Sequence, residues 1–103
     1  MFNSLLNIAG FGSKINFEQL VKEGAIILDV RSKGEYALGH IKGSMHIPVD
    51  QLSSNLSKLK NKQTPIITCC ASGMRSGVAK GILESNGYTA YNGGSWISLQ
   101  SKI

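Results

Sequence analysis

The stretch IITCCASGMRS, residues 66–76, decides the fold of this chain. It opens with a short apolar run, which predicts a strand that is buried on both faces and ends at Cys69 or Cys70. Beyond the stretch, apolar residues recur at helical spacing, at Val78, Ala79, Ile82 and Leu83. The sequence therefore predicts a buried strand, a tight loop and a helix in direct succession.

The N-terminal half of the chain repeats this pattern of strands and helices. Residues 25–30, AIILDV, form another short apolar run and predict a second buried strand. Asn16 and Ser32 are each followed three residues later by Gln or Glu, which is the spacing of a capping box at the start of a helix. These signals predict helices over about 17–23 and 33–38, each followed by a glycine.

The rest of the chain carries further signals of the same kind. Residues 45–47 predict a short strand, and Asp50 is expected to cap a helix that presents leucines on one face. Residues 88–91 predict another strand, residues 92–94 a turn, and the residues around Trp96 a last short helix. Strands that alternate with helices predict a small α/β domain of three layers, with a mostly parallel central sheet flanked by helices.

The length of 103 residues suits one domain with a modest core. We expect residues 14–103 to form this domain and residues 1–13 to be an N-terminal extension, which lacks the early positive charge and long apolar core of a signal peptide. No apolar run approaches the roughly 20 residues of a membrane span. Apolar residues of the extension could form one face of a short helix; they are Phe2, Leu5, Leu6 and Ile8.

Charge and cysteine content exclude several classes of function. The net charge is +5, but the nine lysines are scattered along the chain, so we predict no nucleic-acid partner. The positive excess would favour small anionic substrates by steering. The two adjacent cysteines suit neither a disulfide nor a zinc site. We therefore expect free thiols, no metal and no cofactor in a cytoplasmic, monomeric protein.

The loop after the cysteines predicts a nucleophile beside an anion site. It joins the carboxyl end of a strand to the start of a helix, where ligands of open α/β sheets bind. Backbone N–H groups of such a loop can form an anion cradle, and the positive end of the helix adds to the field. Gly73 permits backbone angles that side chains forbid, and Arg75 supplies a permanent charge. We therefore expect a cysteine with a lowered thiol pKa here.

Two spacings to the same arginine leave two candidates for the nucleophile. From Cys69, five residues intervene before Arg75, which is the spacing of cysteine-dependent phosphatases; from Cys70, four residues intervene. Strand alternation places the two thiols on opposite faces, so only one can head the loop. The phosphatase spacing would place Thr68 where such enzymes commonly have His, and Gly73 one position late. These departures count against the first spacing.

Three motifs together make the chain resemble a known family. They are ILDVRSKGEYALGHIKGSMHIPVDQL (27–52), IITCCASGMRS (66–76) and NGGSWISL (92–99). In this order they resemble the single-domain rhodanese-like sulfurtransferases, and the resemblance covers roughly residues 14–99. The family aligns its catalytic cysteine with Cys70.

The resemblance implies sulfur transfer through a persulfide on Cys70. The loop backbone would hold the persulfide and a small anionic sulfur donor such as thiosulfate, and the acceptor would be cyanide or the thiol of a protein or small molecule. Thiosulfate-specific members often carry a basic residue inside the loop, and this chain has none there. The residues implied to bind the donor are Ala71, Ser72, Gly73, Met74 and Arg75.

Other polar residues near this edge of the sheet have plainer interpretations. Asp29 and Arg31 end the first buried strand and could support the loop from behind, but a structural network that includes Glu35 is the preferred interpretation. His40 and His46 are predicted to be hydrogen-bonded scaffold residues. Two other functions stay open, namely a cysteine-dependent phosphatase or arsenate reductase, and a binding module without catalysis.

Overall fold

A computed structural model describes residues 15–103 of the chain. The short helix considered for residues 1–13 lies outside the described residues. Among the residues that are described, no helix is both long enough and apolar enough to cross a membrane. The elements follow in the order α2 (Phe17–Lys22), β1 (Ile26–Asp29), α3 (Lys33–Leu38), β2 (Met45–His46), α4 (Val49–Leu52), the 3-10 helix η1 (Leu56–Lys58), β3 (Ile66–Cys70), α5 (Met74–Ser85), β4 (Ala90–Ser95) and α6 (Trp96–Gln100).

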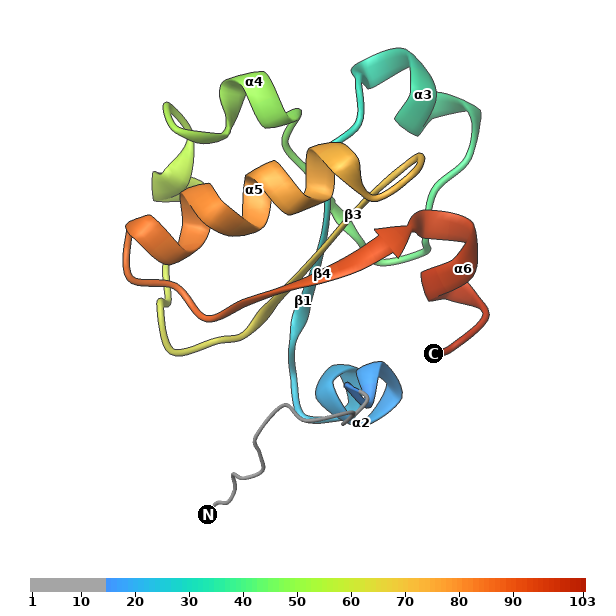
Figure 1. Ribbon diagram of the computed structural model, residues 1–103, viewed down its shortest axis with the longest axis horizontal. Coiled ribbons are helices and arrows are strands. Elements are labelled where there is room, and N and C mark those ends of the chain that lie inside the picture. The colour runs from blue at the N-terminus through green and yellow to red at the C-terminus, as the bar shows by residue number, and fades with distance from the viewer. Residues whose placement is uncertain (1–14) are drawn as a thin grey trace.

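The strands form one sheet in the order β2-β1-β3-β4, and every neighbouring pair is parallel (Figure 1). The predicted α/β fold with a parallel central sheet is therefore confirmed. β1 and β3 occupy the central positions, and Asp29 lies opposite Cys69 in their register. The carboxyl ends of both strands thus lie next to each other at one edge of the sheet.

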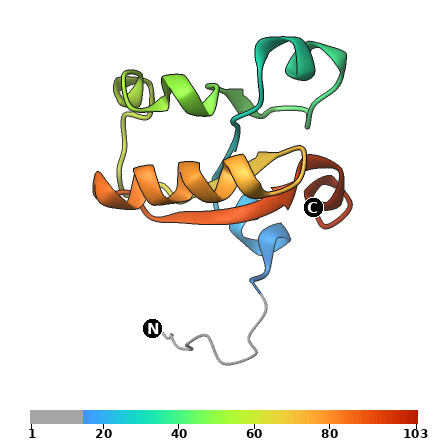
Figure 2. The same ribbon diagram turned by 45° about the horizontal axis from the view of Figure 1, so that its top comes forward.

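Helices cover both faces of the sheet, which gives the predicted three layers (Figure 2). Alternation along β3 divides its residues between these faces. Ile66 and Cys70 pack in the core beneath α4 and α5. Ile67 and Cys69 pack in the second core, beneath α2 and α6. The two cysteines therefore belong to different layers of the molecule, as the alternation predicted.

Side chains cap the first helices where the sequence predicts them. The Glu35 N–H donates to Ser32 Oγ at 3.3 Å, and Glu35 Oε1 accepts the Ser32 N–H at 3.1 Å, which completes the capping box of α3. Asn16 Oδ1 accepts the Gln19 N–H at 3.0 Å. The Gln19 side chain, however, donates to Glu23 and does not return to the cap. The capping box is thus complete at α3 and half formed at α2.

The predicted start of α4 is wrong by two residues. Pro48 is the N-cap residue, and Asp50 lies inside the first turn without a capping hydrogen bond. The N–H of Val49 donates to the carbonyl of Val30 at 3.0 Å, so a contact with the end of β1 fixes where the helix begins. The helix ends after Leu52, and the predicted leucine face continues only in the separate helix η1.

The last strand also differs from the prediction. It covers Ala90–Ser95, so residues 92–94 belong to the strand and do not form a turn. A Cβ atom at Gly93 would lie 2.8 Å from the Thr68 carbonyl oxygen and 2.9 Å from the side chains of Ile67 and Leu99. The glycine is therefore required by close packing against β3, where the register between the two strands shifts.

Candidate active site

The loop between β3 and α5 is short because glycine permits a sharp reversal. Cys70 ends β3, and α5 begins at Met74. Gly73 is the N-cap residue of α5 with a φ of 102°, in the left-handed region that glycine adopts without strain. A Cβ atom there would also meet the Cα of Gly94 on β4 at 3.4 Å. The chain therefore reverses within a few residues, and the first turn of α5 lies beside Cys70.

The Cys70 sulfur lies in a cradle of hydrogen-bond donors. The N–H groups of Gly73 and Ser76 donate to Sγ at 3.0 and 3.4 Å. The S–H group itself donates to Ser76 Oγ at 3.4 Å. Cys70 and Ser76 are fully buried, whereas Ala71 and Ser72 are exposed. The loop therefore surrounds the sulfur with N–H groups and shields it from solvent.

Hydrogen bonds that the Cys70 sulfur accepts lower the pKa of its thiol. Burial acts in the opposite direction, because it disfavours the charged thiolate. The side chain and N–H of Ser76, together with the N–H groups of Gly73 and Ser72, outweigh that effect. The pKa of Cys70 therefore lies below its ordinary value, which favours the reactive thiolate.

Asn92 holds the cradle from the neighbouring strand β4. Its Oδ1 accepts the Ser76 hydroxyl at 2.7 Å and the Gly94 N–H at 2.9 Å. Its Nδ2 donates to the Gly73 carbonyl at 3.1 Å. One amide side chain thus orients the hydroxyl beside the sulfur and also fixes the position of the loop.

Cys69 has a different environment. It packs on the opposite face of the sheet, in the core that contains Phe17 and Leu99. Burial, followed by the negative charge of Asp29, raises the pKa of Cys69 to about 12. A thiol with that pKa stays protonated at neutral pH. The geometry therefore favours Cys70 as the nucleophile, in agreement with the loop spacing.

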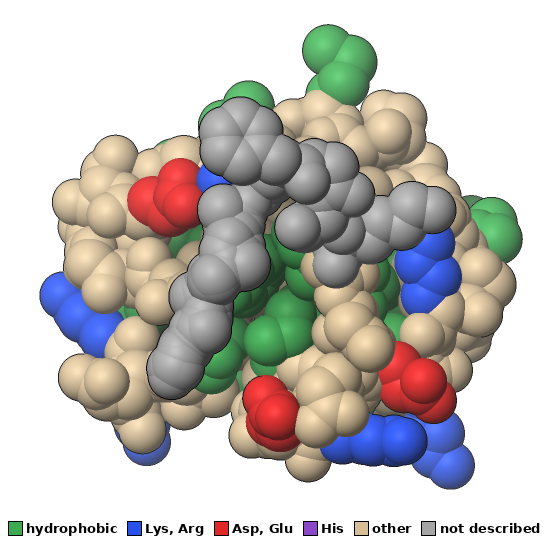
Figure 3. Space-filling model, turned by 60° about the horizontal axis from the view of Figure 1, so that its bottom comes forward, with side chains coloured by type: hydrophobic (Ala, Val, Ile, Leu, Met, Phe, Trp, Pro, Cys, Tyr) green, Lys and Arg blue, Asp and Glu red, His purple; other side chains and the backbone are tan. Residues whose placement is uncertain are grey.

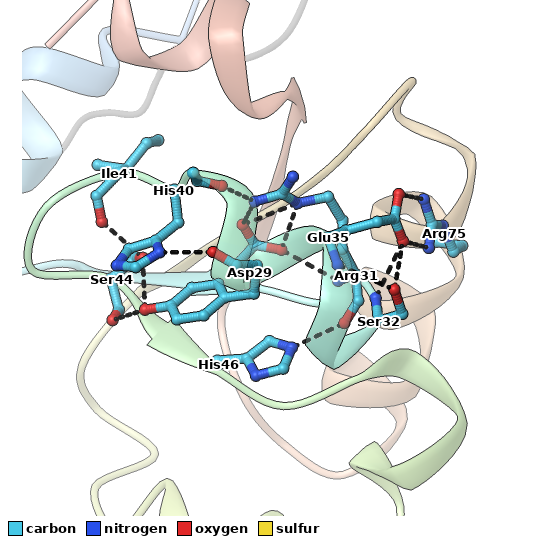
Figure 4. A network of polar contacts seen from close by, with 11 residues as sticks. Asp29, Arg31, Ser32, Glu35, His40, Ile41, Ser44, His46 and Arg75 are labelled. Atoms are coloured by element: carbon cyan, nitrogen blue, oxygen red, sulfur yellow. Dashed lines mark hydrogen bonds and ion pairs between the residues drawn. The ribbon is translucent and has the colours of Figure 1, made fainter.

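The Arg75 side chain extends from α5 toward α3 (Figure 4). Its two terminal nitrogens donate to the two carboxylate oxygens of Glu35 at 2.7 and 3.0 Å. The Arg75 hydrogen bond, followed by those from Ser32, lowers the pKa of Glu35 to about 2. The sequence predicted that Arg75 would face a donor, whereas in the structure its terminal nitrogens face this carboxylate.

Asp29 and Arg31 form a buried ion pair behind the loop. Arg31 donates to the Asp29 carboxylate from its backbone N–H and Nε, both at 3.0 Å, and from a terminal nitrogen at 2.8 Å. That nitrogen also donates to the Gly39 carbonyl at 2.7 Å. The predicted structural network is thus right for Asp29 and Arg31. Glu35 is hydrogen-bonded to Ser32 and Arg75, and no hydrogen bond links it directly to Asp29 or Arg31.

The two histidines fasten the loop that follows α3. The rings of His40 and His46 both stack on Tyr36, with ring centroids 3.7 and 4.3 Å away. His40 Nδ1 is hydrogen-bonded to the Tyr36 carbonyl and His46 Nε2 to the Arg31 carbonyl, each at 2.8 Å. The prediction of scaffold histidines is therefore confirmed.

The structure adds residues that the sequence interpretation missed. Ser76 could have been found, because N–H groups in the first turn of a helix point back toward the preceding loop. Asn92 could not, because the sequence around it indicated a turn. Met74, which the resemblance implies would bind the donor, is 80% exposed.

A separate hollow lies on the face of α2 and contains no cysteine or histidine. Figure 3 shows hydrophobic side chains gathered in a hollow on this side of the molecule. The hollow has a volume of about 300 Å³ and is lined by Ile15, Asn16, Gln19, Leu20, Glu23 and Tyr91.

Within residues 15–103, no group of three or more His, Cys, Asp or Glu side chains is placed to hold a metal ion.

Comparison with known sequences gives a consistent result. A family model for the rhodanese-like domain matches residues 14–95. A thiosulfate sulfurtransferase, GlpE, from Pseudomonas fluorescens is 31% identical over 72 residues, which are 70% of this chain and 65% of that protein. The chain spans between about half and two thirds of the length of the first curated relatives that it matches.

Solved structures agree with this family over most of the chain. A rhodanese-like domain protein from Staphylococcus aureus is 30% identical, with a TM-score of 0.70 that covers 82% of this chain and 86% of that one. The human single-domain sulfurtransferase TSTD1 is 28% identical, with a TM-score of 0.69 over 84% of this chain and 90% of that one. The fold of residues 15–103 is therefore the fold of these proteins.

Proposed function

This chain belongs to the family of rhodanese-like domains, and on that premise we propose that it is a sulfurtransferase that carries sulfane sulfur as a persulfide on Cys70. The observation that carries the proposal is the buried Cys70 sulfur, which accepts hydrogen bonds from the N–H groups of Gly73 and Ser76. Similarity to a thiosulfate sulfurtransferase supports the same reaction.

In the first half-reaction, the Cys70 thiolate attacks the outer sulfur of a donor such as thiosulfate. An S–S bond forms to Cys70, and the S–S bond of the donor breaks with its electron pair leaving on sulfite. The N–H groups of the loop stabilise negative charge on sulfur throughout this step. Because Cys70 is fully buried, the residues around its sulfur must move to admit the donor.

In the second half-reaction, an acceptor thiolate, or cyanide in an assay, attacks the outer sulfur of the persulfide. The Cys70 thiolate is released, and the acceptor keeps the sulfur. We propose protein or low-molecular-weight thiols as acceptors and a reducing cytoplasm as the location, since both cysteines are free thiols. Two half-reactions through a covalent intermediate lead to ping-pong kinetics.

The test is the mass of the intact protein after incubation with thiosulfate. We expect one added sulfur atom on the wild-type protein and on Cys69→Ser, and none on Cys70→Ser. Cyanide-dependent formation of thiocyanate should follow the same pattern, because the persulfide is its source. Cys69→Ser is the matched control, since it removes a neighbouring buried thiol that faces the other core.

Three results would contradict the proposal. An adduct that is lost in Cys69→Ser but kept in Cys70→Ser would assign the reaction to the other cysteine. Hydrolysis of an aryl phosphate that is lost in Cys69→Ser but kept in Cys70→Ser would favour a phosphatase. If neither thiosulfate nor an organic persulfide adds sulfur to the wild-type protein, the domain is better described as a binding module.

A further inference from the structure

Arg75 is the one charged residue among positions 70–75, and a carboxylate already neutralises it. Both of its terminal nitrogens lie against Glu35, at 2.7 and 3.0 Å. Ala71, Ser72 and Met74 carry no charge. The loop around the sulfur therefore presents neutral side chains and one arginine, whose charge is compensated by Glu35 of α3.

The fold fixes Glu35 in this position (Figure 4). Its Oε1 also accepts the N–H and hydroxyl of Ser32, at 3.1 and 2.9 Å, so the capping box of α3 sets the direction of its carboxylate. Because its pKa is about 2, Glu35 is ionised at every pH at which a cysteine thiolate reacts. Arg75 therefore faces an ionised carboxylate at every pH at which Cys70 reacts.

Arg75 lies beside the sulfur cradle, because the next residue, Ser76, contacts the Cys70 sulfur through its N–H at 3.4 Å. Its pKa is raised mainly by Glu35 and, to a smaller degree, by the charge of the Cys70 thiolate. A guanidinium without a partner would therefore stabilise negative charge that enters or develops at the sulfur. With Glu35 in place, the pair carries no net charge, and that stabilisation is much weaker.

Sulfur donors differ in the charge that they bring to such a site. Thiosulfate is a dianion, and its leaving group is the dianion sulfite. An organic persulfide, R–S–SH, has the thiolate R–S⁻ as its leaving group, which carries a single charge when R is uncharged. The Cys70 sulfur is fully buried. A dianion that approaches it loses more solvation than a less charged donor and needs a cation to offset that loss. The cation of this loop, Arg75, is already paired with Glu35.

We propose that Glu35 determines the donor specificity of the site, because it neutralises Arg75 and so selects organic persulfides over thiosulfate. The inference rests on the sulfurtransferase function proposed above and names its donor class. The reaction is Cys70–S⁻ + R–S–SH → Cys70–S–SH + R–S⁻. The S–S bond of the donor breaks, its electron pair leaves on R–S⁻, and the proton stays on the transferred sulfur. Glu35 acts through Arg75 and is therefore a positioning residue.

The decisive variant is Glu35→Gln. Glutamine also serves at this position of a capping box, so the variant removes the charge and keeps the helix start. Persulfide formation on Cys70 is followed by mass in quenched reactions with two probes, thiosulfate and the persulfide of 2-mercaptoethanol, whose R group is uncharged. We expect the wild-type protein to react faster with the organic persulfide. In Glu35→Gln, the rate ratio should shift about tenfold toward thiosulfate, with a lower half-saturating thiosulfate concentration.

Matched variants separate this effect from a structural one. Ser32→Ala weakens the capping box but leaves both charges, and Glu35→Asp keeps the carboxylate, so both should retain a donor ratio near that of the wild-type protein. In an Arg75→Gln background, Glu35→Gln should no longer change the ratio, because the effect passes through Arg75. A shift that persists without Arg75 would overturn the inference.

Ser72→Lys tests the same idea without touching Glu35. It adds a cation to an exposed position of the loop, and the ratio should again move toward thiosulfate. If Glu35→Gln and Ser72→Lys form the persulfide with the wild-type ratio, the specificity inference fails while the proposed function stands. If wild-type Cys70 gains no sulfur from either probe, both fail.

Discussion

The ends of the two central strands show two treatments of a buried polar group at the same edge of the sheet. β1 and β3 are neighbours, with Asp29 opposite Cys69. At the end of β1, the Asp29 carboxylate is bound by the backbone N–H, Nε and a terminal nitrogen of Arg31. At the end of β3, the Cys70 sulfur is bound by N–H groups of the following loop and helix.

The two ends differ in the kind of partner that compensates the buried group; we call the Asp29 end of β1 the closed end and the Cys70 end of β3 the open end. Asp29 has a fully charged side chain as its partner, so the pair is complete and leaves no requirement for a ligand. Cys70 is surrounded by neutral dipoles, which stabilise a thiolate or persulfide without cancelling its charge. Burial therefore does not identify the reactive group here; the character of its partners does.

The largest effect on stability should come from breaking the closed end with Asp29→Asn. The change leaves the Arg31 charge buried without a counter-charge. We expect the free energy of unfolding to fall by about 3 kcal/mol, measured by urea denaturation with the fluorescence of the single tryptophan. Asp50→Asn makes the same change at an exposed carboxylate and should cost less than about 0.5 kcal/mol. Equal stability of the two variants would show that the closed end contributes little.

A smaller effect is expected from Gly93→Ala, which disturbs the packing beside the open end. The new Cβ would lie 2.8 Å from the Thr68 carbonyl oxygen, so β3 would have to shift. We expect a loss of about 1–3 kcal/mol in the free energy of unfolding and slower persulfide formation on Cys70. Gly81→Ala on α5 has open space around it and should be neutral or stabilising by up to about 1 kcal/mol. Similar midpoints in urea would argue against tight packing at Gly93.

The smallest effect should come from Asn92→Asp, which keeps the size of the side chain but changes its charge and its hydrogen bonding at the open end. It replaces the donor to the Gly73 carbonyl with an oxygen and adds negative charge beside Ser76, which contacts the sulfur. Both changes disfavour the thiolate, so the pKa of Cys70 should rise. Alkylation by iodoacetamide, whose rate rises with pH as the thiolate forms, should therefore become slower at neutral pH.

The pH dependence of alkylation supplies the comparison for this variant. In the wild-type protein, its midpoint should lie below the value of about 8.5 for a free cysteine, because hydrogen bonds lower the pKa of Cys70. Asn86→Asp makes the same charge change at the far end of α5 and should leave the curve in place. If Asn92→Asp also leaves it unchanged, the amide does not influence the sulfur.

Local sequence determined the parts of this protein whose interacting groups are close together in the chain. The capping box of Ser32 and Glu35 spans three residues, and it fixed the start of α3. Apolar runs identified β1 and β3, and alternation separated the two cysteines. The loop from Cys70 to Arg75 predicted an activated thiol, because a strand, a glycine and a helix start within a few residues determine where the N–H groups point.

Tertiary structure alone decided the partners that are far apart in the sequence. Glu35 and Arg75 are separated by 40 positions, and Asn92 lies 16 positions from Ser76. These pairs exist because the sheet order places β4 beside β3, and because α3 approaches the start of α5; no local periodicity encodes either proximity. The sequence therefore indicated Cys70 as the candidate nucleophile, while the packing of distant elements decided which charges and hydrogen-bonding groups surround it.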